Sequence, residues 1–370
     1  MSATPIGALL RDKRIVVCCG AGGVGKTTTS AALALAAARM GRRVLVLTID
    51  PSRRLAETLG VARNPPAPVP LPPERQKAAG IAAPGSLEAW MLDPKLVADE
   101  AVRRLVTDPT DAQRVLDNRI YQQVTSMVAG MHEYTAMESL HRLVSSGRYD
   151  LVVLDTPPSR NALDFLEAPG RLARLIDGRI FRMFLPKEPG LIGRAASKLI
   201  ERVLGGVFGA DFAGELLAFF QAFAGLFSTL TGDVTQMRAF LGRSDAAFLL
   251  VTSPSPATLD EAFFFRDKTR ELGLPFEGFV LNKSRARSVG RPSPDESLLP
   301  PGAGAEGQRA LEKLAALARV EESAAKTDAA LLGELAHRAG AGAFAAAVPN
   351  LPTGADDLAT LLAVAEALVG

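Results

Sequence analysis

The chain has 370 residues, of which 48% are hydrophobic, and its formal net charge is +2. This length allows a large core, and the near-neutral charge gives no general attraction to nucleic acid or anionic lipid, so we expect neither as a partner. Residues 1–14 contain no apolar segment after a basic one, which favours the cytoplasm and no stable membrane insertion. Cys18 and Cys19 are adjacent, and we expect them to be small core residues.

The first predicted elements are a strand, a glycine-rich loop and a helix. Residues 14–19 (RIVVCC) form a short β-branched run typical of a buried parallel strand. Residues 20–27 read GAGGVGKT and match the phosphate-loop pattern G-x-x-x-x-G-K-[ST]. The Ala-rich stretch after Lys26 predicts a helix that Gly41 ends. A glycine-rich turn that binds nothing is the alternative, and the order of strand, loop and helix disfavours it.

This loop predicts a site for the phosphates of a nucleotide. Backbone N–H groups of such a loop point at phosphate oxygens, and the helix N-terminus adds a partial positive charge. Lys26 should reach the β and γ phosphates, and the Thr27 hydroxyl should hold Mg²⁺. The expected nucleotide-binding residues of the loop are Gly20, Ala21, Gly22, Gly23, Val24, Gly25, Lys26, Thr27 and Thr28.

Strand and helix patterns alternate along most of the remaining chain. Further strands are expected at residues 43–49, 87–92, 149–154, 246–252, 276–281 and 345–348. Helices are expected within residues 94–146, 172–241, 258–272, 312–338 and 356–369. Between these elements we expect a proline-rich surface loop at 64–85 and a flexible linker at 284–307. The alternation predicts an α/β fold over residues 1–370: one P-loop domain with a doubly wound, mostly parallel sheet.

Two aspartates follow predicted strands, where ligands bind in this class of fold. Asp155 closes LVVLD and is expected to support Mg²⁺ through its water shell. Asp50, in TIDPS, is placed to orient or deprotonate the attacking water. The predicted metal site therefore comprises Thr27, Asp50 and Asp155. The alternative for either aspartate is a helix cap or a turn residue.

Asn282 follows another predicted strand and can hydrogen-bond the edge of a purine. Guanine sites usually place an aspartate three residues later, and here that position is Arg285. The missing acceptor favours ATP over GTP. The alternative is that Asn282 is only a turn residue.

A helical, phenylalanine-rich block at residues 168–242 interrupts the strand–helix alternation, so we interpret it as an insertion. Nine of the 17 phenylalanines lie between Phe181 and Phe240. One apolar stripe at helical spacing consists of Phe212, Leu216, Phe219, Phe220, Phe223, Phe227 and Leu230. Two interpretations stay open: a stripe packed into the core, or the wall of a groove for an apolar peptide, lipid or metabolite.

Several of these motifs together resemble the ArsA/GET group of ATPases, which includes the arsenite-pump ATPase and the ATPase that targets tail-anchored proteins. The matching segments are GAGGVGKTTT, LTIDPSRRLAETLG, YDLVVLDTPPSRNALDFLEAPGRL, VLNKS and VPNLP. The resemblance implies a dimeric ATPase that uses ATP and Mg²⁺ and couples the γ-phosphate to a helical subdomain. It implies that Asp50 is the catalytic aspartate of switch I, that residues 155–161 form switch II, and that Asn282 contacts adenine.

The sequence departs from the family pattern at one position of the phosphate loop. The family usually carries a lysine after the first glycine, which reaches the partner's nucleotide, and here that residue is Ala21. We expect an arginine to replace it, with Arg53 as first choice and Arg54 and Arg160 as further candidates. The alternative is that these arginines lie on the surface or in salt bridges. A histidine of switch II, the zinc-binding C-x-x-C and the arsenite-binding cysteines are also absent.

The sequence thus favours a slow, dimeric ATP-driven switch with a hydrophobic client, either a homodimer or a heterodimer with a paralogue. A nucleotide-gated sensor or scaffold with very slow turnover is the main alternative. An oxyanion-pump subunit ranks lower, because the thiolates that a soft metalloid requires are missing. A membrane-associated partitioning ATPase is disfavoured because the last predicted helix contains no Lys or Arg.

Overall fold

The protein, studied as a computed structural model, is described over residues 4–49, 54–62, 65–105, 108–118, 121–122, 131–157, 239–300, 303–351 and 358–370. Eight strands of these residues form one sheet in the order β3-β4-β2-β5-β1-β6-β7-β8. The strands are β1 (Ile15–Cys19), β2 (Arg43–Thr48), β3 (Val69–Pro70), β4 (Ser86–Met91), β5 (Leu151–Asp155), β6 (Ala246–Thr252), β7 (Phe276–Ser284) and β8 (Phe344–Pro349). Only the β3–β4 pair is antiparallel, which confirms the expected α/β fold with a mostly parallel sheet.

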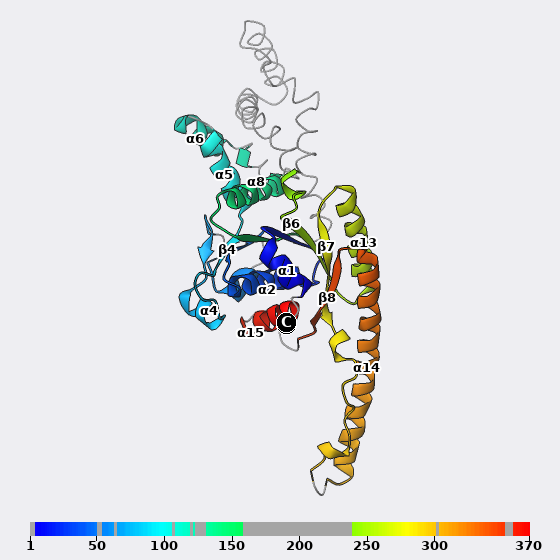
Figure 1. Ribbon diagram of the computed structural model, residues 1–370. Coiled ribbons are helices and arrows are strands. Elements are labelled where there is room, and N and C mark those ends of the chain that lie inside the picture. The colour runs from blue at the N-terminus through cyan, green and yellow to red at the C-terminus, as the bar shows by residue number, and fades with distance from the viewer. Residues whose placement is uncertain are drawn as a thin grey trace, which may run out of the picture.

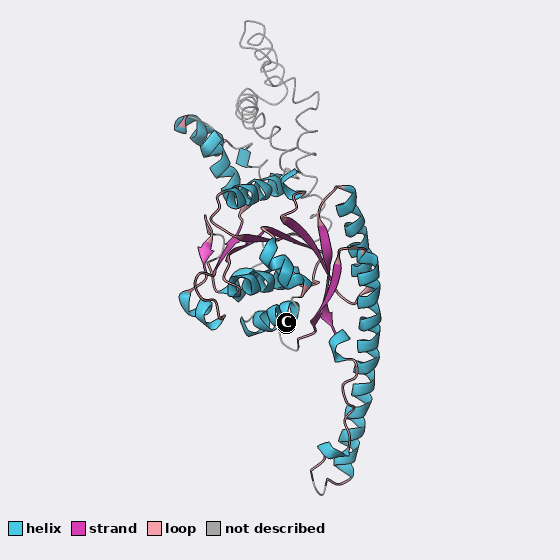
Figure 2. Ribbon diagram, in the orientation of Figure 1, coloured by secondary structure: helices cyan, strands magenta, loops and turns pink. Residues whose placement is uncertain are grey.

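Helices cover both faces of the sheet (Figures 1 and 2). One face carries α1 (Pro5–Asp12), α2 (Lys26–Arg39), α3 (Arg54–Leu59) and α15 (Leu358–Val369). The other carries α5 (Pro94–Leu105), α6 (Pro109–Asp117), α8 (Met131–Ser145), α13 (Pro256–Glu271) and α14 (Ala305–Ala339). This arrangement is the doubly wound one, because each face of the sheet has its own helical layer.

Each face of the sheet has its own apolar core, and β1 contributes to both. Ile15 and Val17 belong to one core and Val16 to the other, as the two-residue period of a strand requires. Cys18 and Cys19 are fully buried, and burial raises the pKa of both thiols. The cysteines are therefore core residues, as their position in the sequence predicts.

One strand and two helices, β3, α4 (Pro73–Ala78) and α1, were not predicted from the sequence. The proline-rich segment expected to be a loop contains β3 and α4, with Pro73 at the start of the helix, where a missing N–H costs nothing. Near the N-terminus, α1 begins at Pro5, and the Thr4 side chain caps it by accepting from the N–H of Gly7 at 3.1 Å. Both helices carry a proline at their first turn, a start signal that a purely hydrophobic pattern does not reveal.

The N-terminal part of α14 extends beyond the sheet, and the segment between β7 and α14 runs beside it (Figure 1). The expected linker at 284–307 contacts this helix: the Arg285 guanidinium pairs with Glu321 at 2.8 Å, and the N–H of Gly290 donates to Glu322. These contacts do not test its flexibility, which stays a prediction. Within the described ranges, no helix is both long enough and apolar enough to span a bilayer.

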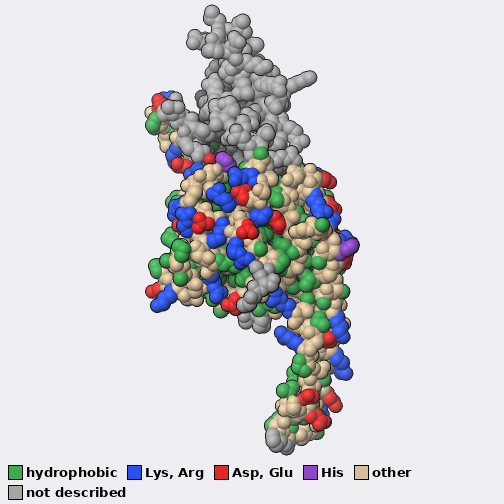
Figure 3. Space-filling model, in the orientation of Figure 1, with side chains coloured by type: hydrophobic (Ala, Val, Ile, Leu, Met, Phe, Trp, Pro, Cys, Tyr) green, Lys and Arg blue, Asp and Glu red, His purple; other side chains and the backbone are tan. Residues whose placement is uncertain are grey.

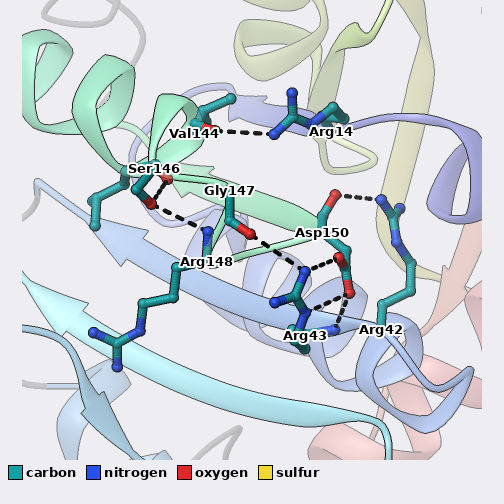
Figure 4. Close-up of polar contacts among 9 residues, drawn as sticks. Arg14, Arg42, Arg43, Val144, Ser146, Gly147, Arg148 and Asp150 are labelled. Atoms are coloured by element: carbon teal, nitrogen blue, oxygen red, sulfur yellow. Dashed lines mark hydrogen bonds and ion pairs between the residues drawn. The ribbon is translucent and has the colours of Figure 1, made fainter.

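Two arginines lie at the start of β2, at the end of the sheet opposite the glycine loop (residues 20–27), and bond to residues of neighbouring segments (Figure 4). The Arg42 guanidinium donates to the carbonyl oxygens of Leu10 at 2.5 Å, Lys13 at 2.7 Å and Asp150. The neighbouring Arg43 forms an exposed ion pair with the Asp150 carboxylate at 2.6 Å. Arg42 thus ties α1, β2 and β5 together from a half-buried position.

On the face of the molecule shown in Figure 3, basic and acidic side chains are interspersed.

We expect Arg42→Ala to lower the free energy of unfolding by about 2–3 kcal/mol, because it removes a charged donor from three carbonyl groups. Arg43→Ala is the matched control and should cost clearly less, since its ion pair is exposed and screened by solvent. Urea unfolding at neutral pH measures both. The Arg43 guanidinium lowers the pKa of Asp150 from 3.8, so the small Arg43 effect should vanish as the pH falls through that lowered pKa. Equal costs for the two variants at neutral pH would contradict this account of Arg42.

Candidate nucleotide-binding site

The glycine loop lies between β1 and α2, at the carboxyl end of a central strand of the sheet. Its shape requires glycine at two positions. A Cβ on Gly20 would lie 2.0 Å from the carbonyl oxygen of Val251, and one on Gly25 would lie 2.1 Å from Nδ2 of Asn282. Gly25 also has a φ of 93° and precedes the first residue of α2. The loop is therefore held tightly against β6 and β7, while Gly22 and Gly23 are exposed.

Lys26 begins α2, and its side chain is buried. The Nζ atom donates to the carbonyl oxygen of Ala21 at 2.8 Å, so the ammonium group lies inside the curl of the loop. The Ala21 side chain is 5% exposed and belongs to the core beneath α2. The position at which the family usually carries a lysine is thus occupied here by a core methyl group.

Asp155, at the end of β5, is an acidic residue next to the loop. Its Oδ2 atom accepts from the Thr27 hydroxyl at 2.7 Å and from the Thr48 hydroxyl at 3.0 Å. Thr48 and Asp155 are direct neighbours in the β2–β5 register. Two of the residues predicted to hold Mg²⁺, Thr27 and Asp155, are therefore hydrogen-bonded to each other. Thr48 is a third oxygen donor that was not predicted, although it stands two residues before Asp50 at the end of a strand.

The end of β7 contacts the glycine loop from the other side. Asn282 is 8% exposed, and its Nδ2 atom donates to the carbonyl oxygen of Val24 at 2.8 Å. Lys283 donates from Nζ to the carbonyl oxygen of Gly23 at 3.0 Å. Asn282 is therefore adjacent to the loop, and its contact with adenine stays a prediction. Lys283 was not assigned a role from the sequence.

Several predicted functional residues lie outside the described residues. They are Asp50, Arg53, Arg160 and Asn161, together with the phenylalanine-rich stripe. Arg54 is the first residue of α3, but its side chain is not described. Phe240, the last phenylalanine of the block, is described: it is buried and packs edge-on against His141 at a centroid distance of 4.8 Å. This phenylalanine belongs to the core.

A phosphate loop at the end of a central parallel strand, with a buried aspartate on the next strand, defines the P-loop class of nucleotide-binding proteins. The family model for anion-transporting ATPases, ArsA_ATPase, matches residues 13–283. The chain belongs to this family, which confirms the resemblance to the ArsA/GET group.

Curated relatives of the chain include proteins with ATPase names. The uncharacterized protein SCO2128 of Streptomyces coelicolor is 30% identical over 266 residues, which is 72% of this chain and 60% of that protein. A putative arsenical pump-driving ATPase 1 of Aquifex aeolicus is 28% identical, over 42% of this chain and 38% of that protein. The ATPase get3 of Schizosaccharomyces pombe is also 28% identical, over 42% of this chain and 44% of that protein. The matches thus span less than two thirds of each relative.

Proposed function

We propose that this protein is a slow, Mg²⁺-dependent ATPase that works as a dimeric switch in the cytoplasm. The observation that carries the proposal is the placement of Lys26 inside the loop with the Thr27–Asp155 pair beside it. The first group is suited to phosphate oxygens and the second to a hard cation. Dimerisation, with a second copy or a paralogue, rests on the family resemblance.

On the phosphate side, the buried Lys26 ammonium would exchange the Ala21 carbonyl for oxygens of the β and γ phosphates. The exchange is favourable because an ionised acceptor makes a stronger hydrogen bond than a neutral carbonyl. The first N–H groups of α2 point out of the helix start toward the same region and favour negative charge there. The chain thus supplies charge and oriented donors without a large rearrangement.

On the metal side, the donor set fits Mg²⁺. The side chains of Thr27, Thr48 and Asp155 bring oxygen atoms together, and oxygen is the ligand type that Mg²⁺ prefers. We propose that Thr27 holds the ion and that Asp155 supports it through water, with Asp50 completing the site. Bound Mg²⁺ would neutralise charge on the phosphates. Asp155 also accepts a hydrogen bond from the Thr27 hydroxyl and thereby holds the first turn of α2 in place.

We propose ATP as the nucleotide. At Arg285, where a guanine site would need an acidic acceptor, the side chain is a cation paired with Glu321 on α14. ATP should therefore bind more tightly than GTP, and competition between the two for a fluorescent ATP analogue measures the preference.

Release of phosphate from γ-labelled ATP tests the enzymatic proposal. Hydrolysis should require Mg²⁺ and stop with EDTA, and light scattering with and without nucleotide should report the dimer. ATP binding without any hydrolysis would favour the sensor or scaffold alternative. Absence of Mg-ATP binding by the intact chain would show the proposal to be wrong.

The client remains a proposal from the sequence: the phenylalanine-rich stripe lines a groove whose opening depends on ATP. We expect an environment-sensitive hydrophobic probe to bind differently in the ATP and ADP states, and Phe219→Ser and Phe223→Ser to weaken that binding while the protein stays folded. The matched control is Phe240→Ser, which should unfold the protein because Phe240 is a core residue. Equal probe binding in both nucleotide states, with unfolding of all three variants, would identify a core helix.

The burial of the two cysteines also disfavours the oxyanion-pump alternative. Binding of a soft metalloid needs accessible thiolates. Cys18 and Cys19 are fully buried, and burial raises the pKa of both thiols, so they stay protonated. These are the two cysteines of the chain.

A further inference from the structure

The end of β7 contains a one-residue bulge beside the glycine loop. Leu281 is paired with Ala347 of β8 and Ser284 with Pro349, so β7 uses one residue more than β8 over this interval. Within the bulge, Lys283 has a φ of 57°, and among the described residues it is the one non-glycine residue with a positive φ. This left-handed conformation is unfavourable for a residue with a long side chain.

The bulge changes the direction of the side chains. Consecutive residues of a regular strand point to opposite faces of the sheet. Here Asn282 and Lys283 are consecutive, yet both donate hydrogen bonds to the glycine loop, to the carbonyl oxygens of Val24 and Gly23. The extra residue therefore directs two neighbouring side chains at two neighbouring peptide groups.

Those two contacts set the direction of two loop N–H groups. In a trans peptide, the C=O and the N–H of one unit point in opposite directions. The carbonyl of Gly23 shares its peptide unit with the N–H of Val24, and the carbonyl of Val24 shares its unit with the N–H of Gly25. Since both carbonyls point at β7, both N–H groups point away from β7. Backbone N–H groups of such loops are the donors that bind phosphate oxygens, so the two contacts with β7 set the direction of two of these donors.

The conformation of Lys283 is fixed from both sides. Asn282 is bonded to the loop, the Ser284 carbonyl accepts from the N–H of Asn350 at 3.1 Å, and the N–H of Arg285 donates to Asp328 at 2.6 Å. Asp328 is buried on α14. Glycine or asparagine would adopt this backbone at lower cost. Lysine at such a position indicates that the side chain itself is required.

We propose that Lys283 is a positioning residue for the nucleotide: with Asn282 it holds the Gly23–Val24 and Val24–Gly25 peptides in the orientation that binds phosphate. The proposal rests on the nucleotide-binding function proposed above. Lys283 acts through the loop and is therefore expected to affect the binding of Mg-ATP more than the fold.

Three variants separate this role from a structural one. Lys283→Gly removes the ammonium and relieves the left-handed backbone, and Lys283→Arg keeps a cation at the same place. Lys77→Ala is the matched control, since Lys77 is an exposed lysine on α4 near the opposite edge of the sheet. Calorimetric titration with Mg-ATP and thermal unfolding without nucleotide are measured for each variant and for the parent.

We expect Lys283→Gly to raise the Kd for Mg-ATP by about 10- to 100-fold while its unfolding temperature stays equal to or above that of the parent. Lys283→Arg should keep most of the affinity, and the control should match the parent. An unchanged Kd in Lys283→Gly would overturn the proposal. So would a loss of affinity that accompanies a lowered unfolding temperature and that arginine does not rescue. If the parent itself fails to bind Mg-ATP, the proposed nucleotide function fails, which is a distinguishable result.

Discussion

Lys26→Ala should abolish detectable Mg-ATP binding at concentrations that saturate the parent protein. The variant loses a buried ammonium group that lies inside the loop, 2.8 Å from the Ala21 carbonyl oxygen. A charged donor contributes about 1.5–3 kcal/mol per hydrogen bond, and two phosphates would share this one, so we expect a loss of affinity of about 100- to 1000-fold or more. Isothermal titration calorimetry measures it.

The fold should tolerate this change. Alanine is the best helix former, and Lys26 is the first residue of α2. Thermal unfolding without nucleotide should therefore match the parent, and Lys77→Ala again controls for the loss of one positive charge. Tight Mg-ATP binding by folded Lys26→Ala would show that the phosphates bind elsewhere.

Asp50→Asn should bind Mg-ATP almost as the parent does and hydrolyse it about 10²–10⁴ times more slowly, as expected for loss of a positioned base. Asp50 lies outside the described residues, but β2 ends at Thr48, whose hydroxyl is bonded to Asp155. Asn keeps the shape of the side chain and removes its charge. Single-turnover hydrolysis separates this step from product release, and an unchanged rate would remove Asp50 from the mechanism.

The same assay tests the arginine that we propose in place of the missing lysine. Arg53→Ala should slow single-turnover hydrolysis, because a cation beside the γ-phosphate is worth about 10³ in rate. Arg54→Ala and Arg160→Ala are compared with it. A substitute cation is needed on this interpretation because Ala21 provides no positive charge, and its methyl group is buried. Three rates equal to that of the parent would leave the missing lysine without a replacement.

The parts of the site that follow from local sequence were predictable. The phosphate loop has a fixed spacing, so the positions of Lys26 and Thr27 follow from it directly. Asp155 was predictable too, because a buried apolar run that ends in aspartate places the carboxylate at the ligand-binding end of a parallel strand. The Thr27 hydroxyl donates to Asp155 at 2.7 Å, so the two residues are neighbours, and their role at a metal ion stays a prediction.

Other features depend on pairing between distant segments, and no local pattern encodes them. The bulge at Lys283 exists only because Ser284 pairs with Pro349 instead of continuing the earlier register. Arg42 stands directly before the predicted strand, and its contacts with Leu10, Lys13 and Asp150 need the folded sheet. Thr48 lay within a predicted strand, and its bond to Asp155 required knowledge of which strands are neighbours.

The strand order also determines when the site can form during synthesis. β1 leaves the ribosome early, but its two neighbours are β5 and β6, which begin at Leu151 and Ala246. Asn282, which holds the loop at Val24, follows that residue by 258 positions. Contacts of such long range form late, and chains that depend on them expose apolar segments in the meantime. The phenylalanine-rich block therefore emerges before β6, β7 and β8 have been made, and a loop held by Asn282 cannot bind nucleotide and assist folding until about three quarters of the chain has been made.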